Sequence, residues 1–128
     1  MQKRLIAVGV LAVLLGCGKD STGPGGNPNP DPQRYVIGVN GATFTPDTLR
    51  ALVGDWIVWE VNSTDAGQHQ IDFTNVPPGA TTSPTNVLSA SQKDSVSFIK
   101  TGIYNYQDQI AQTGGVKGEG VLIISPLP

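Results

Sequence analysis

The chain has 128 residues, 14% of them charged, and a formal net charge of −2 at pH 7. Lys and Arg number eight and form no cluster in the body of the chain, which argues against nucleic acid as a partner because phosphate binding needs grouped cations. The length allows one domain with a modest core once non-globular ends are set aside.

The first residues have the pattern of an export signal. Lys3 and Arg4 precede an unbroken apolar run from Leu5 to Leu15, which is too short to span a bilayer. The run ends in "LLGC", and Cys17 is the only cysteine in the chain. This junction resembles the bacterial lipoprotein signal, in which the cysteine is acylated and becomes the new N-terminus. We therefore predict a lipoprotein signal peptide over residues 1–16 and lipidation of Cys17, rather than an ordinary secretory signal with an unpaired cysteine.

Residues 17–33 are predicted to form the lipidated cysteine and a flexible tether. The stretch after the cysteine, "GKDSTGPGGNPNPDPQ", has no aliphatic or aromatic residue to bury and is rich in Gly and Pro. The expected location is the cell envelope, as a membrane-anchored lipoprotein that faces the periplasm or the cell surface. Gly18 stands where some bacterial lipoproteins carry an aspartate that retains them in the inner membrane, so the outer membrane is favoured.

Residues 34–128 are predicted to form a single all-β domain. Short β-branched and aromatic runs alternate with turn sequences at 34–39, 48–52, 56–62, 69–73, 94–99, 103–107 and 120–125. No segment keeps a 3.6-residue apolar period, so any helix is limited to a single turn. Alternation places the following residues in the core: Ile57, Trp59, Val61, Val96, Phe98, Tyr104 and Tyr106. Trp56 points to the opposite face of its strand, and residues 74–84, with Pro77 and Pro78, are predicted to be a surface loop.

Three stretches, in order, resemble the cupredoxin family, the small sandwiches of plastocyanin, azurin and their relatives. They are "FTPDTLRALVGDWIVWEVNSTDAGQHQI" at 44–71, "SVSFIKTGIYNYQ" at 95–107 and "GGVKGEGVLII" at 114–124. Together they cover essentially the whole predicted domain. The resemblance implies a single Greek-key β-sandwich with cupredoxin-like topology.

Cupredoxins bind copper through an upstream His and a late loop of the form C-x-x-H-x-x-x-G-M-x-G, which combines a thiolate, two imidazoles and a distant thioether. When the motif is aligned on "GGVKG", its Cys falls on Asp108, its second His on Ala111 and its Met on Val116. Only His69, at the upstream position, is of the expected ligand type. Ala111 and Val116 cannot bind a metal.

No other residue can complete a blue-copper site. Cys17 lies at the far end of the tether, Met1 is the only methionine, and the chain has no second histidine. The sequence therefore predicts no cofactor, with copper binding only at low affinity.

His69 and Asp108 are expected to lie close together at one end of the sandwich. One interpretation is a partly buried, hydrogen-bonded pair that holds two loops together. The other is a weak Zn²⁺ or Cu²⁺ site with Asp65, Asp72 or water as further ligands. We favour the pair, because two protein ligands seldom hold a metal tightly.

We do not expect an enzyme. Ser63 or Ser91 could be combined on paper with His69 and Asp108, but nothing in the spacing places a serine on a strained turn. We predict an exported, lipid-anchored cupredoxin-like protein that lacks a complete type 1 copper site and serves as a binding or structural module of the envelope. Its partners would be the membrane, through the anchor, and an unidentified envelope protein or small ligand. The alternatives are a copper-binding or electron-transfer protein with an atypical site, and an adhesion or glycan-binding sandwich.

Overall fold

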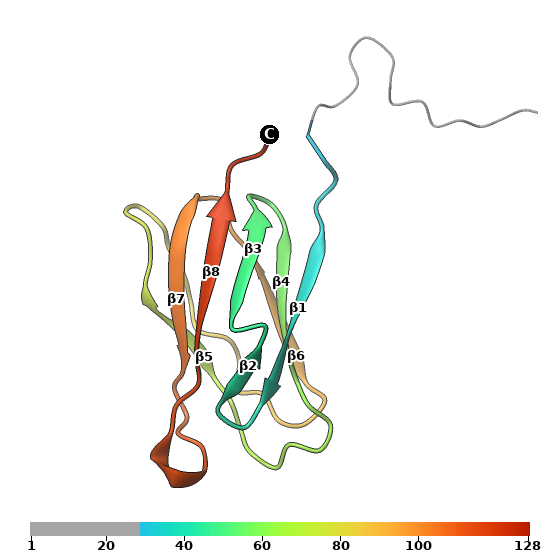
Figure 1. Cartoon of the computed structure of the whole chain (residues 1–128), viewed down its shortest axis with the longest axis vertical. Coiled ribbons are helices and arrows are strands. Elements are labelled where there is room, and N and C mark those ends of the chain that lie inside the picture. Colours follow the sequence, from blue (N-terminus) through green and yellow to red (C-terminus); the bar gives the residue numbers. More distant parts are fainter. Residues whose placement is uncertain (1–28) are drawn as a thin grey trace, which may run out of the picture.

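The structure, a computed structural model, describes residues 29–128. The predicted signal peptide, Cys17 and the first part of the predicted tether lie outside these residues. The described part folds as two four-stranded sheets packed face to face (Figure 1). This confirms the predicted all-β sandwich. Within residues 29–128, no helix is long and apolar enough to cross a membrane.

The first sheet has the strand order β2-β1-β4-β6. β1 runs antiparallel to β2 and parallel to β4, and β6 is antiparallel to β4. The strand bounds are β1 Arg34–Asn40, β2 Thr43–Thr45, β4 Trp56–Val61 and β6 Lys93–Ser97.

The second sheet has the strand order β3-β8-β7-β5. β8 is parallel to β3 and antiparallel to β7, and β5 is antiparallel to β7. The strand bounds are β3 Thr48–Leu52, β5 Ile71–Asn75, β7 Gly102–Asp108 and β8 Glu119–Ser125. Both sheets therefore mix parallel and antiparallel pairs.

The core lies between the sheets and follows the predicted alternation. Ile57, Trp59 and Val61 of β4 are buried, as are Tyr104 and Tyr106 of β7. Five rings meet mostly edge to face, and we call them the aromatic core: Trp59, Phe73, Phe98, Tyr104 and Tyr106. This geometry suits the charge distribution of aromatic rings.

Three details of the predicted strands are wrong. β2 was not predicted, since a three-residue strand gives too little alternation to detect. The strand predicted at 69–73 begins at Ile71, and its continuation through Asn75 removes two residues from the predicted loop. The strand predicted at 94–99 ends at Ser97, although Phe98 is buried as expected. The one described helix is a single 3₁₀ turn, Thr113–Gly115, consistent with the predicted limit.

The chain enters the sandwich at a well-defined point. The backbone N–H of Gln33 donates to the buried carboxylate of Asp55 at 2.7 Å, and the Gln33 carbonyl accepts from the N–H of Trp56 at 2.8 Å. We call this end of the sandwich the tether end. β1, β4 and β7 begin there, β3, β5, β6 and β8 end there, and the C-terminus lies at the same end (Figure 1).

Candidate functional site

The candidate site lies at the opposite end of the sandwich, which we call the His69 end. His69 precedes β5, where it pairs with Leu88: the N–H of each residue donates to the carbonyl of the other, at 2.9 and 2.7 Å. The next residue, Gln70, donates its N–H to the side chain of Asp108 rather than to a strand. A carboxylate replaces the backbone partner here, so β5 begins after His69. The strand predicted from the sequence had included His69.

The predicted pairing of His69 with Asp108 is confirmed. The Nδ1 atom of His69 lies 2.6 Å from Oδ2 of Asp108, and both side chains are fully buried. Asp108 is the last residue of β7, so this contact joins the end of one strand to the segment that leads into another. Burial excludes water from the pair, which makes each hydrogen bond electrostatically stronger than in solvent.

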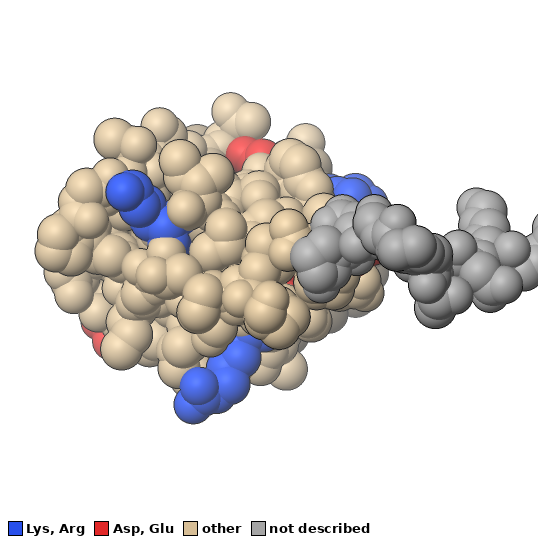
Figure 2. Space-filling view, turned by 90° about the horizontal axis from the view of Figure 1, so that it is seen from above, with Lys and Arg blue, Asp and Glu red and all other residues tan. Residues whose placement is uncertain are grey.

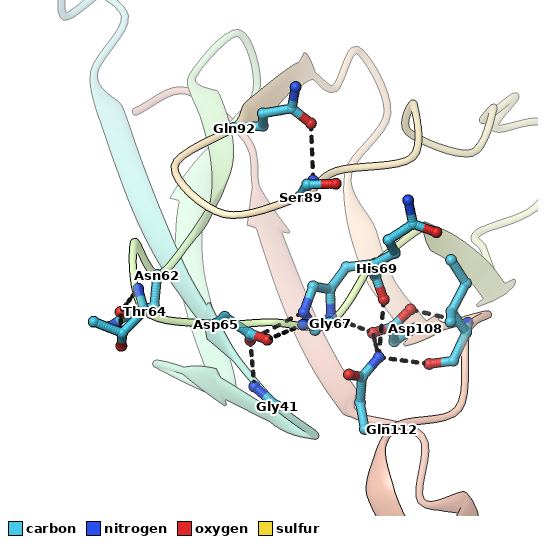
Figure 3. A network of polar contacts seen from close by, with 12 residues as sticks. Gly41, Asn62, Thr64, Asp65, Gly67, His69, Ser89, Gln92, Asp108 and Gln112 are labelled. Carbon is cyan, nitrogen blue, oxygen red and sulfur yellow. Dashed lines mark hydrogen bonds and ion pairs between the residues drawn. The ribbon is translucent and has the colours of Figure 1, made fainter.

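A second carboxylate binds the other side of the imidazole (Figure 3). Asp65 Oδ2 lies 3.0 Å from Nε2 of His69, and Asp65 also accepts the N–H groups of Gly41, at 2.7 Å, and Gly67, at 2.8 Å. Burial raises the pKa of Asp65, but the two N–H donors and the nearby His69 lower it, and the net direction is downward from 3.8. Asp65 therefore links the β1–β2 turn to the loop that carries His69.

Asp108 is satisfied by further donors. Its Oδ1 accepts the N–H groups of Gln70 and Ile110, each at 3.0 Å, and its Oδ2 accepts Nε2–H of Gln112 at 3.2 Å. The Gln112 amide also donates to the carbonyls of Gln68 and Ile110. We call the side chains of Asp65, His69, Asp108 and Gln112 the His69 cluster.

The chemistry of this cluster is set by its donors and acceptors. Ionised carboxylates only accept hydrogen bonds, whereas a neutral imidazole has one N–H and an imidazolium has two. With a carboxylate at each ring nitrogen of His69, the imidazolium form can donate to both Asp65 and Asp108. The neutral ring has one N–H and can donate to only one of the two carboxylates.

The cluster does not fit a copper centre. Asp65 and Asp108 contact opposite nitrogens of the ring, so the two carboxylates do not converge on one point with an imidazole nitrogen. Across residues 29–128, no three His, Cys, Asp or Glu side chains are grouped so that they could hold a metal ion. At the other aligned positions, Ala111 and Val116 are exposed. The candidate ligand Asp72 accepts the N–H of its neighbour Phe73 and takes no part in the cluster.

The serines considered on paper do not join the cluster either. Ser63 and Ser91 line a separate open cleft of about 590 Å³ beside β1 and β4. Both ring nitrogens of His69 already face carboxylates, so neither serine hydroxyl has a basic partner there. Within residues 29–128, His69 is therefore not placed as a base for either serine.

Sequence reasoning found two members of the cluster and misjudged the others. Asp65 was considered as a further metal ligand, but it is a hydrogen-bond acceptor on the second ring nitrogen. Gln112 was not predicted at all. Its neighbour Ala111, which occupies the aligned histidine position, is exposed, while the Gln112 amide turns inward. The presence of an amide next to an expected ligand position is the signal that could have suggested a role for Gln112 in the cluster.

The sequence matches no family model and no curated protein sequence. Solved structures do match. A reduced Cu(I) form at pH 4 of an amicyanin variant aligns with a TM-score of 0.59 and 18% identity, covering 72% of this chain and 82% of that one. A second amicyanin variant, in its Cu(I) form, aligns with a TM-score of 0.60 and 17% identity over 76% and 96% of the two chains. A variant plastocyanin of a fern aligns with a TM-score of 0.56 and 17% identity over 71% and 100%.

At these identities the likeness concerns the fold and not the activity. It agrees with the strand order, the two mixed sheets and the resemblance of the three sequence stretches. The chain is a β-sandwich with the cupredoxin fold.

Proposed function

We propose that this protein is an exported, lipid-anchored module of the cell envelope whose cupredoxin fold has lost the type 1 copper site. The observation that carries the proposal is the contact between His69 Nδ1 and the buried Asp108 carboxylate, at 2.6 Å. In the aligned motif Asp108 occupies the place of the thiolate, which is the ligand that a blue-copper centre cannot lose. A carboxylate there turns a metal ligand set into a hydrogen-bonded pair.

In this proposal the His69 cluster has a structural role. It fastens the β1–β2 turn, the His69 loop and the loop after β7, which are the three segments that shape this end of the sandwich. Rigid loops on a stable sandwich are suited to binding a partner. We propose an envelope protein or small ligand as that partner, and no enzymatic activity.

Copper titration of the unacylated chain, residues 17–128 with Cys17→Ser, tests the proposal. We expect no intense visible absorption, because that band requires a copper–thiolate bond. Any weak copper binding should be the same in a His69→Ala variant. This variant separates the contribution of the buried imidazole to copper binding from that of surface ligands. A copper affinity that falls in that variant would instead favour the alternative of a copper-binding or electron-transfer protein with an atypical site.

Membrane fractionation tests the anchor. Wild-type protein should sediment with the membranes and begin at Cys17, whereas Cys17→Ser should not be processed normally. A soluble wild-type protein that begins at another residue would contradict the lipoprotein proposal. The third candidate function, adhesion or glycan binding, predicts retention on envelope polysaccharide that survives substitutions in the His69 cluster.

A further inference from the structure

The tether end exposes apolar side chains that no part of the sandwich covers. Ile99, in the loop between β6 and β7, is 83% exposed, and Trp56, the first residue of β4, is 45% exposed. Trp56 lies opposite Ser97, which is two residues before Ile99, so Trp56 and Ile99 are close to the same edge of the molecule. Leu127, which follows β8, is also exposed there. Single exposed apolar residues are common, so a second observation is needed to give them meaning.

The second observation is charge. Arg34 begins β1 directly opposite Trp56, and Lys100 follows Ile99. Two acids lie at this end of the sandwich. Asp55 is buried, and its carboxylate accepts the N–H groups of Gln33 and Leu52. Asp31, two residues before Gln33, is exposed. Viewed from above, this end is mostly uncharged, with Lys and Arg side chains around it and little acidic surface (Figure 2).

The rest of the sandwich has the opposite charge. Within residues 34–128, seven acidic side chains lie along the strands or at the His69 end: Asp47, Glu60, Asp65, Asp72, Asp94, Asp108 and Glu119. In the same part of the sandwich, the cations of residues 34–128 are Lys93 and Lys117. Arg50 is not counted there, since it lies near the end of β3 that belongs to the tether end. The molecule is therefore basic and apolar at one end and acidic at the other.

We propose that the tether end rests on the anionic surface of the membrane that holds the acylated Cys17. The contact surface, which we call the lipid-facing surface, consists of Arg34, Trp56, Ile99, Lys100 and Leu127. Trp and aliphatic side chains partition into the interfacial region of a bilayer, and each nearby cation strengthens binding to anionic lipid roughly fivefold. The acidic His69 end is repelled by the same surface.

The position of the anchor supports this orientation, and here the inference rests on the proposed lipidation. The 16 residues from Gly18 to Gln33 span at most about 55 Å, so the domain cannot leave the neighbourhood of the bilayer. A tether of this length gives a high effective concentration, and a contact too weak to hold a free domain is then sufficient. The tether joins the domain at the lipid-facing surface, next to Trp56. The His69 end consequently faces away from the membrane.

The chain offers a direct test, because Cys17 is its only cysteine. The unacylated chain, residues 17–128, is coupled through this thiol to a maleimide lipid in vesicles of phosphatidylglycerol and phosphatidylcholine in equal parts. Quenching of tryptophan emission by brominated acyl chains reports contact of Trp56, since Trp59 is fully buried. We expect strong quenching on these vesicles and a severalfold weaker effect on phosphatidylcholine alone.

Two matched double variants locate the contact. Ile99→Ser with Lys100→Glu changes the lipid-facing surface, and Val116→Ser with Lys117→Glu makes the same chemical change at the His69 end, where Val116 is 54% exposed. All four side chains are exposed, so both variants should unfold at the wild-type temperature. The first should lose the quenching and the second should keep it. Equal quenching in both variants, or loss only in the second, would overturn the proposal, as would wild-type protein that shows no quenching.

Because the maleimide lipid supplies the anchor, the result does not depend on acylation in the cell. Quenching in vesicles together with an unacylated cellular protein would leave the lipid-facing surface intact and remove the lipoprotein proposal. Acylation in the cell without quenching in vesicles would do the reverse, and would assign the exposed apolar residues to a protein partner.

Discussion

His69 and Asp108 of the His69 cluster are fully buried, as are Trp59, Tyr104 and Tyr106 of the aromatic core, yet the two regions stabilise the sandwich in different ways. In the cluster, every carboxylate oxygen and both imidazole nitrogens have a hydrogen-bond partner. In the aromatic core, Nε1 of Trp59 and the hydroxyl of Tyr106 have none among the described residues. The core joins the two sheets by packing area, which tolerates an unpaired polar atom. The cluster joins three loops by direction-specific hydrogen bonds, and these do not tolerate an unpaired polar atom.

The largest expected effect comes from removing the centre of the cluster. Asp108→Ala would leave His69 and three further donors without their acceptor in a buried site. We expect it to lower the free energy of unfolding by about 3–5 kcal/mol, measured by urea denaturation at neutral pH. Asp108→Asn, which keeps one acceptor oxygen, should cost clearly less. A loss below about 1 kcal/mol in the alanine variant would mean that the cluster is not a main support of the fold.

The aromatic core should be most sensitive to added volume. A Cβ atom at Gly120 would overlap the ring of Tyr106, which lies across β8 at that position. We expect Gly120→Ala to cost about 1–3 kcal/mol in unfolding free energy. Gly38→Ala is the matched control, since Gly38 is also in a strand and its Cβ would lie 3.6 Å from the nearest atom, the carbonyl oxygen of Thr45. Equal costs in the two variants would show that the ring of Tyr106 can move aside.

A smaller effect is expected from Asp65, and it should depend on pH. Its folded pKa lies below the unfolded value, so its stabilisation is present above about pH 4 and is lost as the pH falls through the folded value. Asp65→Asn should therefore cost about 1 kcal/mol at pH 7 and progressively less towards pH 3. Urea midpoints of both proteins across this range measure the difference. A difference that stays constant would remove Asp65 from the acid sensitivity of the fold.

The smallest effect at neutral pH concerns the unpaired hydroxyl of the aromatic core. Tyr106→Phe should change the unfolding free energy by less than about 0.5 kcal/mol at pH 7, because no hydrogen bond is lost. Burial raises the pKa of Tyr106 to about 12, although the nearby Trp59 indole lowers it. The wild type should thus lose stability relative to the variant as the pH rises from about 10 to 12. Thermal unfolding temperatures that run parallel up to pH 12 would contradict this.

These two regions also differ in how far they could be predicted. The aromatic core follows from alternation, since Trp59, Tyr104 and Tyr106 stand at inward positions of strands that the sequence pattern identifies. The His69 cluster follows only in part. Alignment with the copper-binding motif predicted that His69 and Asp108 lie close together. Asp65 and Gln112, however, lie in irregular segments. Their side-chain directions depend on turn geometry that no periodic pattern encodes.

The position of β8 in the sandwich has a consequence for how the protein is made. β8 is the last strand in the chain, but it lies in the interior of its sheet, between β3 and β7. β3 has no other partner in that sheet, so nothing can pair with it until the final residues, Glu119 to Ser125, are available. Completion of this sheet is therefore postponed until β8 is available to pair with β3. For the export that we propose, this order of events would keep the sandwich open until β8 is available.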